Sequence, residues 1–145
     1  MGLTYADITL ANGADTYLAK LGRIPKEEVR KMKVSALADS GAYMLVINEN
    51  IRTQLELPTY EQHTAKLADG SIIPCDIVGP VDILFENRAT TCRAIVLPGD
   101  AQVLLGAIPI EDMDVLIDLK NNKLVVNPAH PYIAETMLVS VNLVR

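Results

Sequence analysis

The sequence predicts a mainly β protein with one or two short helices. Half of the 145 residues are hydrophobic, and Val, Ile and Leu are abundant among them. Short apolar runs alternate with turn signals at the spacing typical of sandwiches and barrels. A chain of this length is expected to form one domain, so residues 1–145 should fold around a single core.

Strand and helix signals alternate through the first half of the chain. Asp15 and Asn48 are of residue types preferred at helix N-caps, and each precedes a short helical segment. Gly22 is expected to end the first helix, and Pro58 prevents the second from continuing. The end of the second strand, residues 34–38, is small and apolar throughout, which indicates burial on both sides. We expect strands at residues 3–10, 29–38 and 43–47, and helices at residues 16–21 and 49–55.

Turn dipeptides divide the second half of the chain. Asp69-Gly70 lies between strand-like flanks and is a strong short-range signal for a β-hairpin. Asn121-Asn122 is expected to join two later strands as a two-residue hairpin turn. Pro109 and the acidic residues that follow it indicate a single helical turn at residues 109–113. The strands are expected at residues 75–81, 81–86, 90–97, 102–107, 115–119, 123–126 and 137–143.

Charge and composition argue against several classes of function. Thirteen basic and eighteen acidic residues give a net charge of -5, and the nearest approach to a basic run is Arg30-Lys31-Lys33. Nucleic-acid recognition needs clustered Lys and Arg, so we expect no nucleic-acid partner. No apolar run approaches the roughly 20 residues that a membrane helix needs, so we expect no membrane association. The first residues also lack the features of a secretory signal.

The cysteines and histidines are few and are not arranged as metal ligands. Cys75 and Cys92 are too few for a disulfide scaffold and lack CxxC spacing, so we interpret them as reduced thiols of a cytoplasmic protein. His63 and His130 stand alone, without the paired pattern of a metalloenzyme. We therefore expect no metal and no other cofactor.

One polar segment interrupts two apolar strands. Asp39-Ser40-Gly41-Ala42 follows the small apolar residues 34–38 and precedes the apolar strand at 43–47. By itself, Asp-Ser-Gly is usually an ordinary turn in which the Asp accepts backbone N–H groups. In this context the carboxylate would lie at the mouth of a buried strand pair, where it is costly unless it is hydrogen-bonded or functional.

Three features in this order carry a likeness to a known family: Asp39-Ser40-Gly41 between apolar strands, the Asp69-Gly70 hairpin, and an apolar strand that ends in glycine, Leu104-Leu105-Gly106. With them the chain resembles the retropepsin-like aspartic proteases, and among them the small bacterial single-lobe subfamily. The resemblance covers about residues 34–131 and leaves residues 1–30 as an N-terminal extension. Ser40 replaces the more usual Thr but keeps the hydroxyl, and Ala38 replaces a larger aliphatic residue. The segments that carry the resemblance are Leu37-Ala38-Asp39-Ser40-Gly41-Ala42, Leu67-Ala68-Asp69-Gly70-Ser71, Val103-Leu104-Leu105-Gly106-Ala107-Ile108-Pro109, Asp114-Val115-Leu116-Ile117-Asp118 and Leu124-Val125-Val126-Asn127-Pro128.

The resemblance implies a closed acid-protease barrel and an aspartic endopeptidase with Asp39 as its catalytic residue. Ser40, Gly41 and Ala42 would complete the active-site loop, with the Ser40 hydroxyl bonding across to a partner loop. Residues Leu67, Ala68, Asp69, Gly70 and Ser71 would form a flap over a peptide or protein substrate. Leu104, Leu105 and Gly106 would support the loop, because glycine allows a strand to pass close behind it.

The chemistry that the resemblance implies needs two carboxylates, but the chain has a single Asp-Ser-Gly. We therefore expect a C2 homodimer in which each chain contributes one Asp39. The terminal residues 132–145, with a strand at 137–143, are expected either to take part in the dimer or to cover their own barrel.

Two other functions remain open, and several polar residues have simpler interpretations. The same fold could serve as a non-catalytic dimeric module that binds peptides by strand addition, or as a self-processing segment of a larger system. Asp114 and Asp118 are interpreted as solvated or turn-capping residues on one face of a strand. His63 is expected to be exposed, and Cys75 and Cys92 to be small residues within strands rather than nucleophiles.

Overall fold

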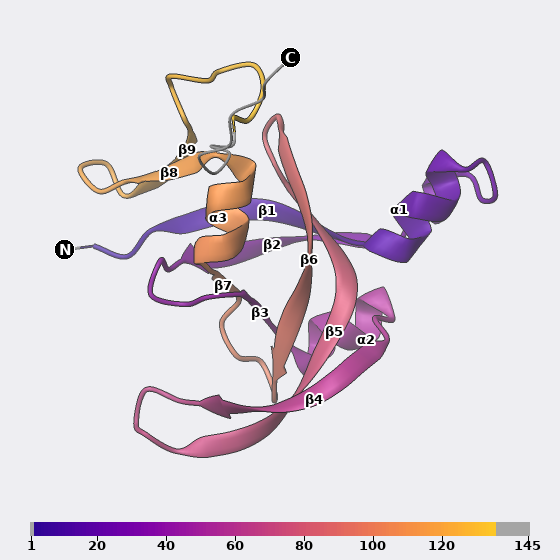
Figure 1. Ribbon diagram of the computed structural model, residues 1–145, viewed down its shortest axis with the longest axis horizontal. Coiled ribbons are helices and arrows are strands. Elements are labelled where there is room, and N and C mark those ends of the chain that lie inside the picture. Colours follow the sequence, from indigo (N-terminus) through magenta and orange to yellow (C-terminus); the bar gives the residue numbers. More distant parts are fainter. Residues whose placement is uncertain (1, 136–145) are drawn as a thin grey trace, which may run out of the picture.

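The computed structural model describes residues 2–135 (Figure 1). Within that range the chain is mainly β, with short helices between the strands. The elements, in chain order, are β1 (Tyr5–Asn12), α1 (Gly13–Lys20), the 3-10 helix η1 (Lys26–Glu28), β2 (Lys31–Ala38), β3 (Leu45–Asn48), α2 (Glu49–Leu55), β4 (Thr59–Lys66), β5 (Ile72–Phe85), β6 (Arg88–Leu97), β7 (Leu104–Leu105), α3 (Ala107–Met113), β8 (Val115–Asp118) and β9 (Lys123–Val126).

Six strands close into a barrel, which confirms the predicted mainly β barrel. They are hydrogen-bonded in the order β1-β2-β7-β3-β6-β5, and β5 returns to pair with β1. β4 extends the sheet beyond β5, and β8 and β9 form a separate two-stranded hairpin. Closure removes the free edges that an open sheet of the same strands would present.

The long strand β5 belongs to two parts of the sheet because its register shifts in the middle. Residues 72–78 pair with β4, whereas residues 81–84 pair with β1. The register against β6 shifts between Val78 and Val81, as it does at a β-bulge. A bulge bends its strand and increases the local twist. This bend lets one strand close the barrel at one end and support the β4–β5 hairpin at the other.

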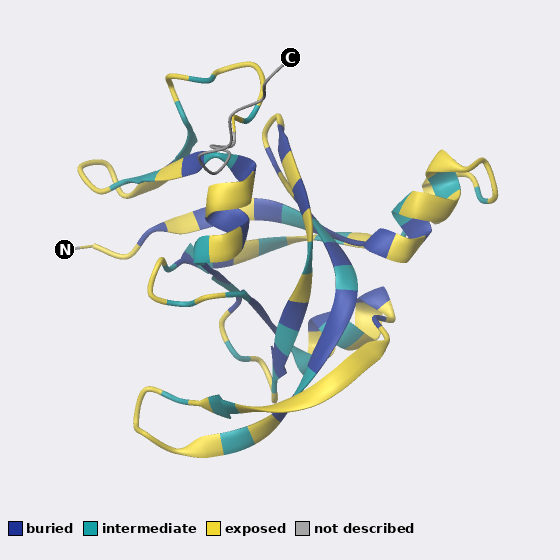
Figure 2. Cartoon of the chain, in the orientation of Figure 1, coloured by how far each residue is buried: buried dark blue, intermediate teal, exposed yellow. Residues whose placement is uncertain are grey.

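The core lies inside the barrel and follows the two-residue alternation of the strands (Figure 2). In β1, Ala6, Ile8 and Leu10 point inward, while Tyr5 and Asp7 are exposed. The helix α2 adds Ile51 and Leu55 to the core, and α3 adds its own buried face. Burial of these side chains supplies the main stabilising free energy, at about 25 cal/mol for each Å² of apolar surface.

Several local expectations differ from the structure. α1 begins at Gly13, and its N-cap is Asn12 rather than Asp15, because the Asn12 side chain accepts the Asp15 N–H. Three α-helices occur within residues 2–135, since residues 107–113 form a full helix. The strand expected at residues 102–107 is reduced to the two residues of β7, and four residues rather than two separate β8 from β9. Residues 34–38 are not buried on both sides, because Ser35 is exposed. The strand expected at 137–143 lies outside the described residues.

The N-terminal residues form part of the barrel, whereas we expected residues 1–30 to extend beyond the barrel pattern. β1 pairs along seven residues with β2 and along four with β5. Within residues 5–30, α1, η1 and their connections stand outside the barrel wall, whereas β1 is part of it (Figure 1). The sequence motif around Asp39 does not predict the position of β1. The N-terminal strand reaches that part of the fold only through its long-range pairing with β2.

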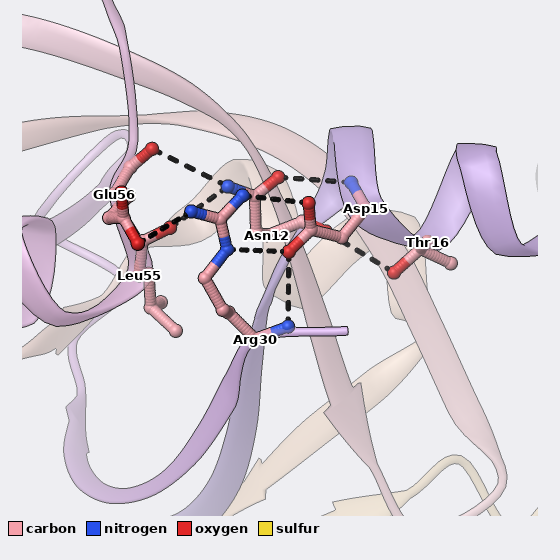
Figure 3. A network of polar contacts seen from close by, with 6 residues as sticks. All are labelled: Asn12, Asp15, Thr16, Arg30, Leu55 and Glu56. Carbon is pink, nitrogen blue, oxygen red and sulfur yellow. Dashed lines mark hydrogen bonds and ion pairs between the residues drawn. The ribbon is translucent and has the colours of Figure 1, made fainter. Parts of the chain in front are cut away.

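A polar cluster attaches α1 to the barrel (Figure 3). The Arg30 guanidinium donates to both carboxylate oxygens of Asp15, at 2.7 and 2.8 Å, and it also pairs with Glu56 at 2.8 Å. Asn12 is buried and donates its side-chain N–H to the Leu55 carbonyl at 2.9 Å. The hydrogen bond from Arg30 is the largest cause of the lowered pKa of Asp15.

Substitution Asp15→Asn is expected to lower the free energy of unfolding at neutral pH by about 1–3 kcal/mol, because Arg30 and its backbone N–H lose a charged acceptor. The pKa of Asp15 is lowered in the folded state, so its contribution is present above the ordinary aspartate range and is lost as pH falls through the folded pKa. Urea denaturation from neutral to acidic pH measures both effects. The exposed Asp7→Asn is the matched control. Equal losses in the two variants would contradict the expectation.

Candidate functional site

Asp39 lies immediately after β2, at the start of the loop that leads to β3. Its side chain is half-buried, while Ser40 and Gly41 are exposed and Ala42 is half-buried. The carboxylate Oδ1 accepts the Gly41 N–H at 2.9 Å. The loop thus holds one carboxylate at the surface, at the end of a barrel strand, in a defined orientation.

The strand β7 lies between β2 and β3, although those two strands are neighbours in the sequence. β7 is parallel to β2 and antiparallel to β3. Asp39 donates its backbone N–H to the Leu105 carbonyl at 2.9 Å. On the other side of the loop, the Ala107 N–H donates to the Ala42 carbonyl at 2.8 Å. The structure therefore brings the expected active-site loop together with the expected supporting residues Leu104, Leu105 and Gly106.

Gly106 is the point of closest approach between the two segments. A Cβ added at this position would lie 2.3 Å from the Met44 carbonyl oxygen and 2.7 Å from the Tyr43 carbonyl carbon. Both obstacles are backbone atoms, which cannot move aside as a flexible side chain can. A side chain at position 106 would therefore collide with the backbone of residues 43 and 44, at the end of the connection that begins with Asp39.

The segment Leu67–Ser71 forms the tip of the β4–β5 hairpin. The Gly70 N–H donates to the Leu67 carbonyl at 2.9 Å, and Gly70 has a φ of +89°, which favours glycine. The Asp69 carboxylate accepts the hydroxyl and the backbone N–H of Ser71 at 2.6 and 2.9 Å. These bonds lower the pKa of Asp69, the Ser71 hydroxyl being the largest cause. Ala68, Asp69, Gly70 and Ser71 are exposed, and Leu67 is half-buried.

The hairpin and the Asp39 loop belong to different parts of the sheet. Figure 1 shows the hairpin tip and the β2–β3 connection on the same side of the barrel in this view. The Asp39 carboxylate accepts its hydrogen bond from within its own loop. Within a single chain, therefore, the described contacts join Asp39 to β7 but do not join it to the hairpin tip.

Neither cysteine is suited to act as a nucleophile at neutral pH. Burial is the largest cause that raises the pKa of Cys92, to about 12, with contributions from Asp82 and Asp112. Burial also raises the pKa of Cys75. Both thiols lie in strands, as expected, and both are free. A thiol that stays protonated is a weak nucleophile, since the thiolate is the reactive form.

The isolated polar residues take the following positions. His63 is exposed, as expected, and its Nε2 lies 3.0 Å from a Glu61 carboxylate oxygen. Asp118 caps the β8–β9 turn by accepting the Lys120 and Asn121 N–H groups, in agreement with the turn-capping interpretation. Asp114 does not share a strand face with Asp118, because it ends α3 with a φ of +55° before β8 begins.

Asp114 is instead the centre of a cluster that sequence reasoning missed. Its carboxylate accepts the Asn127 side-chain N–H at 3.0 Å and the Glu135 backbone N–H at 3.0 Å, and it lies 2.6 Å from His130 Nδ1. The Asn127 hydrogen bond is the largest cause that lowers the pKa of Asp114 to about 2. No motif signals this cluster, because its members meet only when β8 and β9 fold back on α3. Its role is to attach residues 127–135 to the end of α3.

The described residues also bear on two other kinds of feature, metal sites and membrane-spanning helices. Among residues 2–135, no group of three or more His, Cys, Asp or Glu side chains is arranged to hold a metal ion. Over the same residues, none of the helices combines the length and the apolar character that crossing a membrane requires.

Comparison with known protein families found no match for this chain, and a search of curated proteins found none either. Interpretation of the site therefore depends on its own residues and geometry.

Substitution Gly106→Ala is expected to destabilise the fold by about 3 kcal/mol, because the new methyl group overlaps backbone atoms of Tyr43 and Met44. The matched control is Gly99→Ala, since Gly99 has a φ of +67° but no atom within 4 Å of an added methyl group. That control tests the backbone strain alone, about 1–2 kcal/mol. Urea denaturation measures both variants. A loss at position 106 no greater than that at position 99 would show that the close approach is not needed.

Proposed function

We propose that this protein is an aspartic endopeptidase that acts as a homodimer. The observation that carries the proposal is the attachment of the Asp39 loop to β7, in which Gly106 passes behind the loop at a distance that excludes any side chain. The exposed β4–β5 hairpin supplies a flap for the same reaction.

The reaction requires a water molecule held between two carboxylates. One carboxylate is ionised and accepts a proton from the attacking water, while the other is protonated and polarises the peptide carbonyl. Two adjacent carboxylates do not both ionise readily, so they share one proton and titrate as a pair. The water oxygen bonds to the carbonyl carbon while the carbonyl oxygen takes the proton of the second carboxylic acid, which gives a diol intermediate. The C–N bond then breaks, the proton taken from water passes to the amine nitrogen, and the diol returns its proton to the carboxylate pair.

The second carboxylate is supplied by a second chain, because the sequence contains one Asp-Ser-Gly. In a C2 dimer the same loop faces its own copy across the two-fold axis. The exposed side chains of Tyr43 and Ile108, 77% and 48% accessible, lie beside the Asp39 loop and support an interface there. The backbones of these two residues are joined by a hydrogen bond from the Ile108 N–H to the Tyr43 carbonyl at 3.0 Å.

The remaining loop residues take supporting roles in this proposal. The Ser40 hydroxyl is exposed and is free to bond across to the partner loop. Gly41 turns the chain so that its N–H reaches the Asp39 carboxylate. The flap would close over a bound peptide and exclude water. The two free cysteines fit a reducing compartment such as the cytoplasm.

A second candidate is a non-catalytic dimeric module that binds extended peptides. The observation that favours it is β4, which pairs with β5 on one side and ends the order of strands in the sheet. An extended peptide could add to such an edge through main-chain hydrogen bonds. The two candidates differ in whether Asp39 is needed for turnover.

The wild-type protein is expected to cleave a mixed peptide library, and Asp39→Asn is expected to lose all cleavage while retaining the fold. Cleavage should follow a bell-shaped pH profile with an acidic to near-neutral optimum, because one proton must be shared by the pair. Mass spectrometry of the library from about pH 3 to pH 8 measures the cleavage.

The exposed Asp100→Asn serves as the matched control and should cleave as the wild type does. Binding of peptides by wild type and Asp39→Asn alike, with no cleavage by either, would favour the binding module. A rate that rises steadily above about pH 8 would contradict the shared-proton mechanism.

Sedimentation velocity is expected to show a dimer at micromolar concentration. Because the site would lie on the two-fold axis, mixing Asp39→Asn with wild type should reduce activity more than dilution with an inert protein does. A protein that stays monomeric at high micromolar concentration would contradict the dimer.

A further inference from the structure

The helix α1 stands away from the barrel at the end opposite the β2–β3 connection (Figure 1). Residues of α1 line two cavities. The volumes of the two cavities are about 500 Å³ and about 450 Å³. They share four lining residues, so they form one groove around the helix. This α1 groove is defined by Thr16, Lys20, Lys26, Lys31, Asp82 and Thr91.

The charge of the α1 groove is opposite to that of the rest of the chain. Its charged lining residues are Lys20, Lys26, Lys31 and Asp82, a net charge of +2, whereas the other residues of the chain carry -7. Lys20, Lys26 and Lys31 all line the groove. Within residues 2–135, none of these three lysines forms an ion pair. The carboxylate that faces them is Asp82, and it accepts the Thr91 hydroxyl at 2.7 Å.

The floor and walls of the groove are largely apolar. Val29 and Leu84 line it, together with three alanines from β1, α1 and β6. Tyr17 lines the second cavity and is 64% exposed. A ligand that fits this surface needs apolar side chains for the floor and negative charges for the rim.

The two walls are held in place before any ligand binds. Asp15 belongs to α1, and Arg30 immediately precedes Lys31 at the start of β2. The hydrogen bonds between them, drawn in Figure 3, therefore join one wall to the other. A preformed groove binds with a smaller loss of conformational entropy than a surface that must first become ordered.

We propose that the α1 groove docks an acidic peptide segment of a partner protein, one in which glutamate or aspartate residues alternate with apolar side chains. The groove is separate from the proposed catalytic site, because Lys31 and Asp39 lie at opposite ends of β2, roughly 25 Å apart for eight residues of strand. The proposal does not depend on the protease function.

Charge complementarity selects this occupant over two others. Residues 136–145 of the same chain contain no Asp or Glu, so they do not match the basic rim. A nucleic-acid backbone would be repelled by the net charge of -7 on the residues outside the groove, and Tyr17 is the one aromatic side chain that lines the groove for base stacking. A short acidic peptide meets the basic rim and the apolar floor without covering the acidic surface.

Fluorescence anisotropy with a short dye-labelled peptide, glutamates around two central leucines, tests the proposal on the full-length protein. The wild type should bind it, and binding should weaken as salt is added. The double variant Lys20→Glu/Lys31→Glu should bind at least about tenfold more weakly, since two attractive charges become repulsive. The matched control Lys120→Glu/Lys123→Glu changes the same charge on the exposed β8–β9 turn and should bind as the wild type does.

Additional variants and ligands distinguish an acidic peptide from other occupants of the α1 groove. Asp39→Asn should bind the acidic peptide unchanged, whatever its effect on cleavage. In the neutral variant Lys20→Gln/Lys31→Gln, a smaller loss of affinity than in the Glu variant is expected, and circular dichroism checks that both are folded. Equal weakening by the groove and control variants would overturn the proposal. Binding of a single-stranded oligonucleotide as tightly as the peptide would also overturn it, as would equal affinity for a peptide with lysines in place of the glutamates.

Discussion

Insertion of β7 between β2 and β3 is the constraint on which the rest of the structure depends. Two residues, Leu104 and Leu105, pair with strands that are consecutive in the chain and would otherwise be joined as neighbours. The connection between β2 and β3 must then pass over the end of β7, which places Asp39 and Gly106 against each other. Because Gly106 has no side chain, the loop and the supporting strand meet through backbone contacts alone. The position of α3, which begins directly after Gly106, follows from the same insertion, while the pairing of β5 with β1 closes the barrel.

Paired polar groups hold the segments that lie outside the apolar core. Arg30 joins α1 to the start of β2 and, through Glu56, to the end of α2. Asp114 joins the end of α3 to residues 127–135. Its carboxylate contacts the side chains of Asn127 and His130 and accepts the backbone N–H of Glu135. These polar groups can be partly buried without a large loss of free energy because each carboxylate accepts hydrogen bonds from donor groups. The barrel is thus stabilised by apolar burial, whereas its attachments depend on a few hydrogen-bonded charges.

The strand β2 connects the two surfaces to which we assign function. Its C-terminal end carries Asp39, and its N-terminal end carries Lys31 beside the α1 groove. Both surfaces depend on elements that are far apart in the sequence, β7 for the first and the β5–β6 hairpin for the second. The two ends of this one strand therefore lie at separate surfaces, and each surface is completed by a different distant element.

The sequence by itself determined the mainly β class, the hairpin at Asp69-Gly70, the helix capped by Asn48 and the isolated carboxylate of Asp39 between apolar strands. These features depend on local propensity and on residues within a few positions of one another. Only the tertiary structure decided that β1 closes the barrel, that Asp114, Asn127 and His130 meet, and that Asn12 rather than Asp15 caps α1. Asp15 is instead bound by Arg30, a contact between residues fifteen apart. Such contacts form between residues that are far apart in the chain, which no short sequence pattern specifies. They therefore stabilise the protein only after the strands of the barrel have paired.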